Sequence, residues 1–119
     1  MQQASGERLV MTTVSTPEQA AVLARELVEN NLAACATCLP GATSYFRWKS
    51  NTVSVEPEVV LLIKTHSDRL TALEDYFRRQ HPYDCPELVV LEISELASAY
   101  AQWLRQELHL APSSPTKDQ

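Results

Sequence analysis

The stretch HPYDCPE at residues 81–87 places four chemically capable side chains, His81, Tyr83, Cys85 and Glu87, within seven positions. A neutral imidazole suits copper and zinc, so His81 is a candidate metal ligand. It also follows a predicted helix, where a histidine can instead cap the last turn. Cys85 could act with His81 as thiolate and base or as a second soft ligand, or it could be an ordinary loop thiol. The residues leave these alternatives open.

Two further cysteines, Cys35 and Cys38, form a C-x-x-C motif. A redox motif of the thioredoxin type would begin a helix, whose N-terminus lowers the pKa of the thiol. This motif lies in a predicted strand, where residues three apart point to opposite faces, so one metal ion shared by both sulfurs is not expected. We expect Cys38 to pack as a small apolar side chain, and Cys35 either to pack likewise or to serve as a functional thiol.

Lys64 ends the predicted strand 53–64, and Glu87 lies at the start of the predicted strand 88–93. They could approach each other across a cleft that also contains Tyr83 and His81. In an oligomer, such a cleft between subunits could hold a small anion or a metal complex. The alternative is a structural ion pair worth about 0 to 1 kcal/mol if exposed.

Periodicity and turn residues predict the elements that position these side chains. Thr16 and Pro17 are suited to begin a helix, and Asn30 and Asn31 to end it. A second helix should be capped by Ser67 and Asp68 and should end near Gln80, before Pro82. The predicted strands are 7–13, 33–48, 53–64 and 88–93.

A last helix carries an apolar stripe that includes Leu96, Tyr100, Trp103, Leu104 and Leu108, and Trp103 is predicted to lie in the core. The order βαββαβ with a final helix predicts an α+β fold, the ferredoxin-like sandwich with its helices on one face of an antiparallel sheet. We expect one domain over residues 1–110 and a disordered C-terminal tail over residues 111–119.

The predicted hairpin of strands 33–48 and 53–64 is longer than the domain needs, since 14 to 16 residues reach roughly 50 Å. It should project, bent where Pro40-Gly41 and Pro57 interrupt it. Near its tip, residues 45–49 read YFRWK. These aromatic side chains either form a local cluster or anchor the hairpin to another subunit, and we expect the anchor, in a ring-shaped homo-oligomer, because an exposed aromatic arm favours aggregation.

The charge, the apolar runs and the cysteine count of the chain argue against some classes of function. Its formal charge of −5 and pI near 5.1 set up no cationic field, so nucleic acid is not an expected partner. The longest apolar run, residues 59–63, is too short to cross a membrane, and the N-terminus has no export signal. Three cysteines without such a signal predict reduced thiols and a cytoplasmic location.

Four stretches, NNLAACATCLPGATSYFRWK, VVLLIKT, HPYDCPELVVLEI and YAQWL, resemble in order and spacing the CutA family of divalent-cation tolerance proteins. The resemblance implies a homotrimer of ferredoxin-like subunits, with hairpins paired across interfaces and an architecture like that of the PII signalling proteins. It implies an association with copper or other divalent ions. The candidate metal ligands are thus His81 and Cys35, which matches a cysteine of the family, and the candidate ligand-binding residues are Trp48, Lys64, Tyr83 and Glu87.

The chain departs from the family pattern where Lys49-Ser50-Asn51 replaces a glycine and an acidic run, and where Thr12 and Gln80 occupy positions of a cysteine and a histidine in some relatives. From the resemblance, and because the sequence shows no catalytic constellation, we predict a non-enzymatic homotrimer that binds copper, another divalent ion or a small ligand between subunits. The alternatives are a small enzyme using Cys35 or Cys85 with His81, and a trimeric scaffold that anchors another protein.

Overall fold

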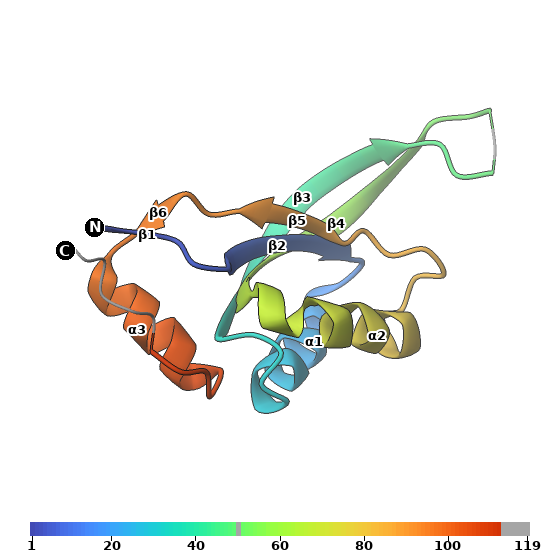
Figure 1. Ribbon diagram of the computed structural model, residues 1–119. Helices are drawn as coiled ribbons and strands as arrows, with labels where there is room; N and C mark the ends of the chain where they lie inside the picture. The colour runs from blue at the N-terminus through green and yellow to red at the C-terminus, as the bar shows by residue number, and fades with distance from the viewer. Residues whose placement is uncertain (50, 113–119) are drawn as a thin grey trace.

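The structure is a computed structural model that describes residues 1–49 and 51–112. Its four main strands form one antiparallel sheet in the order β3-β4-β2-β5, and α1 and α2 cover one face of that sheet (Figure 1). The elements are β1 (Gln2–Gln3), β2 (Glu7–Val14), α1 (Pro17–Glu29), β3 (Cys35–Phe46), β4 (Ser54–His66), a 3-10 turn (Ser67–Arg69), α2 (Leu70–Gln80), β5 (Val89–Glu92), β6 (Glu95–Leu96) and α3 (Ser98–Glu107). This order and topology confirm the predicted ferredoxin-like α+β fold.

The first helix begins and ends as predicted. The Thr16 hydroxyl accepts a hydrogen bond from the backbone N–H of Gln19, and the Gln19 side chain accepts one from the backbone N–H of Ser15. At the other end, Asn31 adopts a φ of 59°, the left-handed conformation that an asparagine tolerates after a helix. Both ends of α1 therefore follow from local sequence.

The second helix begins differently from the prediction. Its preceding 3-10 turn is capped by His66, whose Nδ1 accepts a hydrogen bond from the backbone N–H of Asp68 at 3.0 Å. Ser67 and Asp68, the predicted caps, lie inside that turn. A histidine nitrogen can replace the usual serine or aspartate oxygen because the cap requires only an acceptor near the first free N–H groups.

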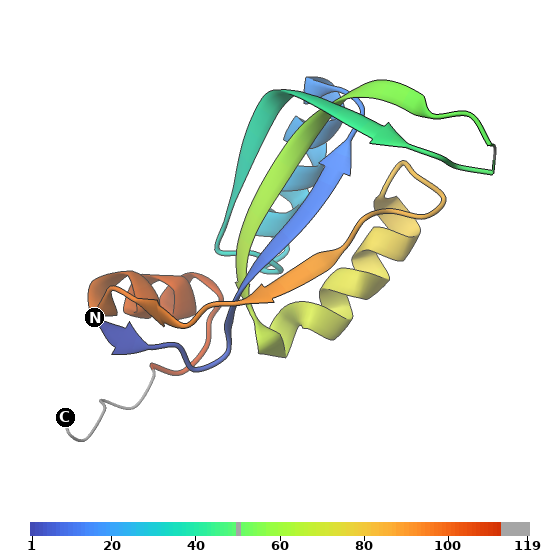
Figure 2. The ribbon, with the colours of Figure 1, turned by 90° about the horizontal axis from the view of Figure 1, so that it is seen from above.

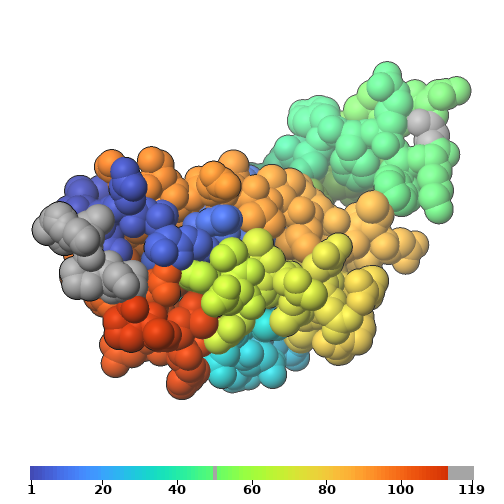
Figure 3. All heavy atoms as spheres, viewed as in Figure 1, coloured from blue at the N-terminus to red at the C-terminus, as the bar shows by residue number. Residues whose placement is uncertain are grey.

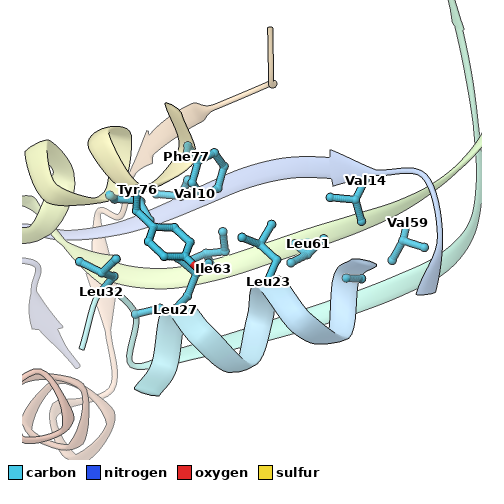
Figure 4. Close-up of a cluster of buried hydrophobic side chains, with 13 residues drawn as sticks. Val10, Val14, Leu23, Leu27, Leu32, Val59, Leu61, Ile63, Tyr76 and Phe77 are labelled. Carbon is cyan, nitrogen blue, oxygen red and sulfur yellow. The ribbon is translucent and has the colours of Figure 1, made fainter. Parts of the chain in front are cut away.

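The main core lies between the sheet and the two helices that cover it (Figure 4). Even-numbered residues of β2 and odd-numbered residues of β4 point into it, as the two-residue period of a strand requires. The fully buried members are Val10, Val14, Ala20, Leu27, Leu61, Ile63 and Leu73.

The C-terminal helix contradicts one prediction. Trp103 is 38% exposed and stacks against Tyr100 with 5.4 Å between ring centroids. The buried face of α3 instead carries Ala101, Leu104, Arg105 and Leu108. The prediction failed because Trp103 and Leu104 are adjacent in sequence and point in directions about 100° apart, so an amphipathic stripe can be centred on either.

The β3–β4 hairpin projects well beyond the rest of the molecule (Figures 2 and 3). The register between the two strands shifts between Leu39 and Ala42, around Pro40-Gly41, and β4 pairs with β2 only from Val59 onward. We call the projecting residues, 42–49 and 51–58, the arm. The molecule measures 55 × 24 × 23 Å, which confirms a projecting hairpin.

Candidate functional site

The face of the sheet opposite α1 and α2 is uncovered and largely apolar. Residues directly opposite each other on paired strands share a face, so the register places Leu9 and Met11 together with Leu62 and Leu91. We call this surface the open face; its apolar residues are Leu9, Met11, Leu39, Val60, Leu62, Val89 and Leu91. Val89, Leu91 and Leu39 are each more than 40% exposed.

A polar cluster lies at the end of the open face nearest the arm. The Tyr83 hydroxyl donates to Glu58 at 2.5 Å and receives a hydrogen bond from the Ser15 hydroxyl at 2.9 Å. The Ser44 hydroxyl donates to the other carboxylate oxygen of Glu58 at 2.6 Å. Burial and then the bond to Glu58 raise the pKa of Tyr83, so its hydroxyl stays protonated as the donor. We call Ser15, Ser44, Glu58 and Tyr83 the arm-root cluster.

His81 lies behind this cluster, on the core side of the sheet. Its Nε2 is 3.0 Å from the carbonyl oxygen of Thr13 and 3.2 Å from the hydroxyl of Thr12, and its Nδ1 accepts a hydrogen bond from the backbone N–H of Tyr83 at 3.1 Å. A carbonyl only accepts and an N–H only donates, so the neutral ring carries its proton on Nε2. Burial lowers the pKa of His81, although the Thr13 carbonyl and the Glu58 charge partly oppose this.

His81 therefore serves as a fixed connector in the single chain. Its backbone N–H bonds to the Phe77 carbonyl and ends α2. Its side chain ties the following loop to β2. A metal ion at Nδ1 would have to displace the Tyr83 N–H, so this geometry of one chain does not present a free imidazole ligand.

A second polar cluster lies at the other end of the open face. Cys35 and Lys64 are direct partners in the register of β3 and β4, and the Lys64 Nζ is 3.6 Å from the Cys35 sulfur and 3.0 Å from the Thr37 hydroxyl. Tyr100 approaches Cys35 from α3, and burial first and this thiol second raise the pKa of Tyr100. We call Cys35, Thr37, Lys64 and Tyr100 the thiol cluster.

The two cysteines of the C-x-x-C motif point to opposite faces, as predicted. Cys38 packs against the main core and its thiol contacts the Ala20 carbonyl oxygen at 3.8 Å, and burial raises its pKa. Cys35 lies on the open face with Lys64. Cys35, Cys38 and Cys85 are all free, and Cys85 is exposed in the loop before β5.

The predicted ligand-binding residues fall into separate places within one chain. Lys64 is six residues from Glu58 along β4, about 20 Å at 3.3 Å per residue, so it lies far from Tyr83. Glu87 is exposed in the loop before β5, and Trp48 is exposed on the arm. The predicted cleft containing Lys64, Glu87, Tyr83 and His81 is not assembled by a single chain and stays a prediction about an assembly.

The buried, hydrogen-bonded positions of Glu58 and Arg105 were not predicted from the sequence. Glu58 is buried between two hydroxyl donors, yet the sequence shows only an acidic residue after Pro57. Arg105 is buried on α3, where its guanidinium bonds to Glu7 at 3.3 Å and to the Ser5 carbonyl at 2.5 Å. Its spacing from Ala101 and Leu108 on a buried helix face was the available signal.

No three histidine, cysteine, aspartate or glutamate side chains lie close enough together to hold a metal ion within residues 1–49 and 51–112. Over the same residues, no helix combines the length and apolar character needed to span a bilayer.

Residues 8–107 match the family model described as "CutA1 divalent ion tolerance protein". The divalent-cation tolerance protein CutA of Thermus thermophilus is 40% identical over 100 residues, which cover 84% of this chain and 96% of that protein. The corresponding protein of Pectobacterium atrosepticum is 41% identical over 101 residues, covering 83% and 91% of the two chains.

Solved structures agree with these relatives. CutA from Synechococcus elongatus superposes with a TM-score of 0.85 at 39% identity, covering 89% of this chain and 93% of that one. The Thermus thermophilus protein superposes with a TM-score of 0.81 at 40% identity, covering 85% and 97%. With one family model matching nearly all the described residues and relatives near 40% identity, this chain belongs to the CutA family of divalent-cation tolerance proteins.

Proposed function

We propose that the protein acts in divalent-cation tolerance as a non-enzymatic homotrimer that binds copper, another divalent ion or a small ligand in clefts between its subunits. The observation that carries this proposal is the open face, an apolar surface with a polar cluster at each end. An apolar surface of this kind is typical of a protein interface. Subunits that cover it would bring ligand side chains of different chains together.

The arm supports the same arrangement. Its residues Tyr45, Trp48 and Val55 are each more than half exposed, and its strands have unpaired edges beyond the sheet. Large aromatic side chains and free strand edges are features of surfaces that associate with a partner chain. We propose that the arm of each subunit packs on a neighbouring subunit, as in a PII-like trimer.

The residues of one chain do not by themselves fit a metal ion, because His81 has both ring nitrogens engaged and Cys35 lies on the opposite face of the sheet. Any binding by His81 or Cys35 therefore depends on rearrangement or on ligands from a second subunit. We keep Trp48, Lys64, Tyr83 and Glu87 as the proposed ligand-binding residues of the intersubunit cleft. The three free thiols are compatible with the proposed cytoplasmic location.

Separation of Cys35 from His81 within the chain also weakens one form of the enzyme alternative, the one that pairs Cys35 with His81. A nucleophile and its base must lie within hydrogen-bond reach, whereas Cys35 contacts Lys64 and His81 contacts residues of β2 and the Tyr83 backbone. No observation favours the scaffold alternative over the trimeric binding protein.

Native mass spectrometry of the protein without metal and with added Cu²⁺ tests the proposal. We expect a trimer that binds Cu²⁺ in multiples of three, with binding weakened in His81→Asn and in Cys35→Ser. The matched control is His109→Asn, because His109 is exposed and has a φ of 58°, which asparagine tolerates. A monomer would contradict the assembly, and a trimer whose Cu²⁺ binding is unchanged in His81→Asn and Cys35→Ser would contradict the assigned ligands.

A further inference from the structure

The pairing of β3 with β4 holds a thiol and an amine in contact. Cys35 and Lys64 are directly opposite each other in the register, so the backbone of the sheet fixes their separation. Side chains at such positions have Cβ atoms roughly 4.5 to 5.5 Å apart. The Lys64 Nζ lies 3.6 Å from the Cys35 sulfur.

Neighbouring groups hold both side chains in this position. The Thr37 hydroxyl oxygen accepts a hydrogen bond from the Lys64 ammonium at 3.0 Å, which directs the long lysine side chain back across the strand pair. Tyr100 from α3 lies against the Cys35 thiol. Cys35 is half-buried, with Lys64 and Tyr100 in contact with its thiol. A molecule as small as hydrogen peroxide can still reach the sulfur.

The three cysteines differ in this respect. Cys38 points into the core side of the sheet and contacts a backbone carbonyl. Cys85 is exposed in the loop before β5. Cys35 has a lysine amine within 4 Å, so it is the thiol whose oxidation product could be captured by a nearby nitrogen.

We propose that Cys35 and Lys64 form a reversible oxidative cross-link, a sulfenamide bond between the Cys35 sulfur and the Lys64 nitrogen, when the protein meets a peroxide. In the first step the Cys35 thiol is oxidised by two electrons to the sulfenic acid, and hydrogen peroxide is reduced to water. In the second step the Lys64 amine, after losing the ammonium proton, attacks the sulfur. A new S–N bond forms, the S–O bond breaks, and the departing hydroxide takes up a proton and leaves as water.

This bond would join β3 to β4 covalently and would remove both a thiol and a positive charge from the open face. A dithiol such as dithiothreitol would reverse it: one thiolate attacks the Cys35 sulfur, the S–N bond breaks and the amine leaves with a proton, and the second thiol then displaces the mixed disulfide, which releases the Cys35 thiol and the oxidised reductant. The cross-link requires only the contact within one chain, and because Cys35 is also a proposed metal ligand, a bound ion would compete with Lys64 for its sulfur.

Intact-mass and peptide measurements test the proposal. The full-length protein is reduced, transferred to buffer without thiol, treated with hydrogen peroxide, and weighed under denaturing, non-reducing conditions. We expect a product lighter by about 2 Da, restored to the original mass by dithiothreitol. Since trypsin does not cleave at a modified lysine, digestion should yield residues 26–47 joined to residues 50–69, with Cys35 bonded to Lys64.

Variants separate this bond from a disulfide, which also lowers the mass by about 2 Da. Lys64→Arg keeps the positive charge and Cys35→Ser keeps the size, and both should abolish the product. Cys38→Ser, the matched cysteine control, should form it normally. If either variant fails to fold, the joined peptide in the wild-type digest decides the question.

Three results would overturn the proposal. One is an unchanged mass after peroxide treatment. Another is a gain of about 16 or 32 Da on Cys35 with normal cleavage at Lys64, which would mean that the sulfenic acid forms or is oxidised further without capture. The third is a 2 Da loss that persists in Lys64→Arg.

Discussion

The hydrogen-bond partners of His81 and Tyr83, beside the root of the arm, set which of their atoms carry a proton. His81 is neutral because one ring nitrogen faces a carbonyl and the other faces an N–H. Tyr83 is a donor because Glu58 can only accept while ionised. These assignments make the region rigid, and they link β2, the loop after α2 and the arm through side chains alone.

The lowered pKa of His81 predicts how stability changes with pH. Unfolded, this histidine takes up a proton near its ordinary value of 6.5, whereas the folded protein resists protonation until lower pH. The free energy of unfolding should therefore decline as pH falls from about 6.5 toward the folded-state pKa, and His81 should contribute no pH dependence above that range. Chemical denaturation at pH values across this range measures the effect.

His81→Asn should flatten this part of the stability profile, and His109→Asn should leave it as in the wild type. Glu58 and Tyr83 face the same region, but the raised pKa of Tyr83 keeps its hydroxyl protonated across this range. An identical slope in wild type and His81→Asn would show that another group is responsible.

At the scale of elements, α3 is attached to the sheet by charge as well as by packing. Glu7 of β2 is completely buried and accepts hydrogen bonds from Arg105 at 3.3 Å and from the Ser5 backbone N–H at 2.6 Å. Burial alone would raise the pKa of Glu7, but the Ser5 backbone bond and the Arg105 charge lower it overall. Gly6, with a φ of 103°, leaves room for His66, since a Cβ there would come within 2.5 Å of its Nε2.

Arg105→Met should destabilise the protein strongly, by about 3–5 kcal/mol, because it leaves the Glu7 carboxylate buried without its partner. Glu7→Gln in the same chain should recover part of this loss, since a neutral amide is cheaper to bury. Denaturant unfolding at equal protein concentrations provides the comparison.

Arg25→Met is the control for this network, because Arg25 and Glu29 form an exposed pair on α1 at 3.9 Å and its loss should change stability little. A loss for Arg105→Met no larger than that of the control would contradict a structural role for the Glu7–Arg105 contact.

Most elements could be predicted from local sequence, but their contacts could not. The start and end of α1 follow from the capping and turn preferences of Thr16-Pro17 and Asn30-Asn31. Pro40-Gly41 predicted the break in the hairpin. Cys35 and Cys38 were correctly assigned to opposite faces by strand period alone. The hydrogen bonds of Glu58 with Ser44 and Tyr83 depend on strand register and on a loop from elsewhere in the chain, which no local pattern encodes.

At the scale of the whole molecule, the two faces of the sheet differ in what covers them. One is covered by α1 and α2, and the other presents apolar side chains and, among the described residues, is contacted by α3 at the thiol cluster (Figures 1 and 2). The arm extends this uncovered surface beyond the body. The open face and the arm together therefore form a surface suited to a partner.

Leu39→Asp should dissociate the proposed trimer, because it places a charge within the open face. Val22→Asp is the matched control, since Val22 is 59% exposed on α1, on the opposite side of the sheet. Light scattering coupled to size exclusion at micromolar concentration should give about three times 13.3 kDa for the wild type and for Val22→Asp, and a smaller mass for Leu39→Asp. Equal masses for both variants would contradict an interface at Leu39.

The long shape of the molecule separates its two tryptophans. Trp48 belongs to the arm and Trp103 to α3, and both are partly exposed. The arm and α3 lie at opposite ends of the ribbon (Figure 1). Indole fluorescence responds to the polarity around each ring, so Trp103→Phe leaves an emitter that reports on the arm, and Trp48→Phe leaves one that reports on the body. The chain thus carries its own optical probe at each end, without any added dye.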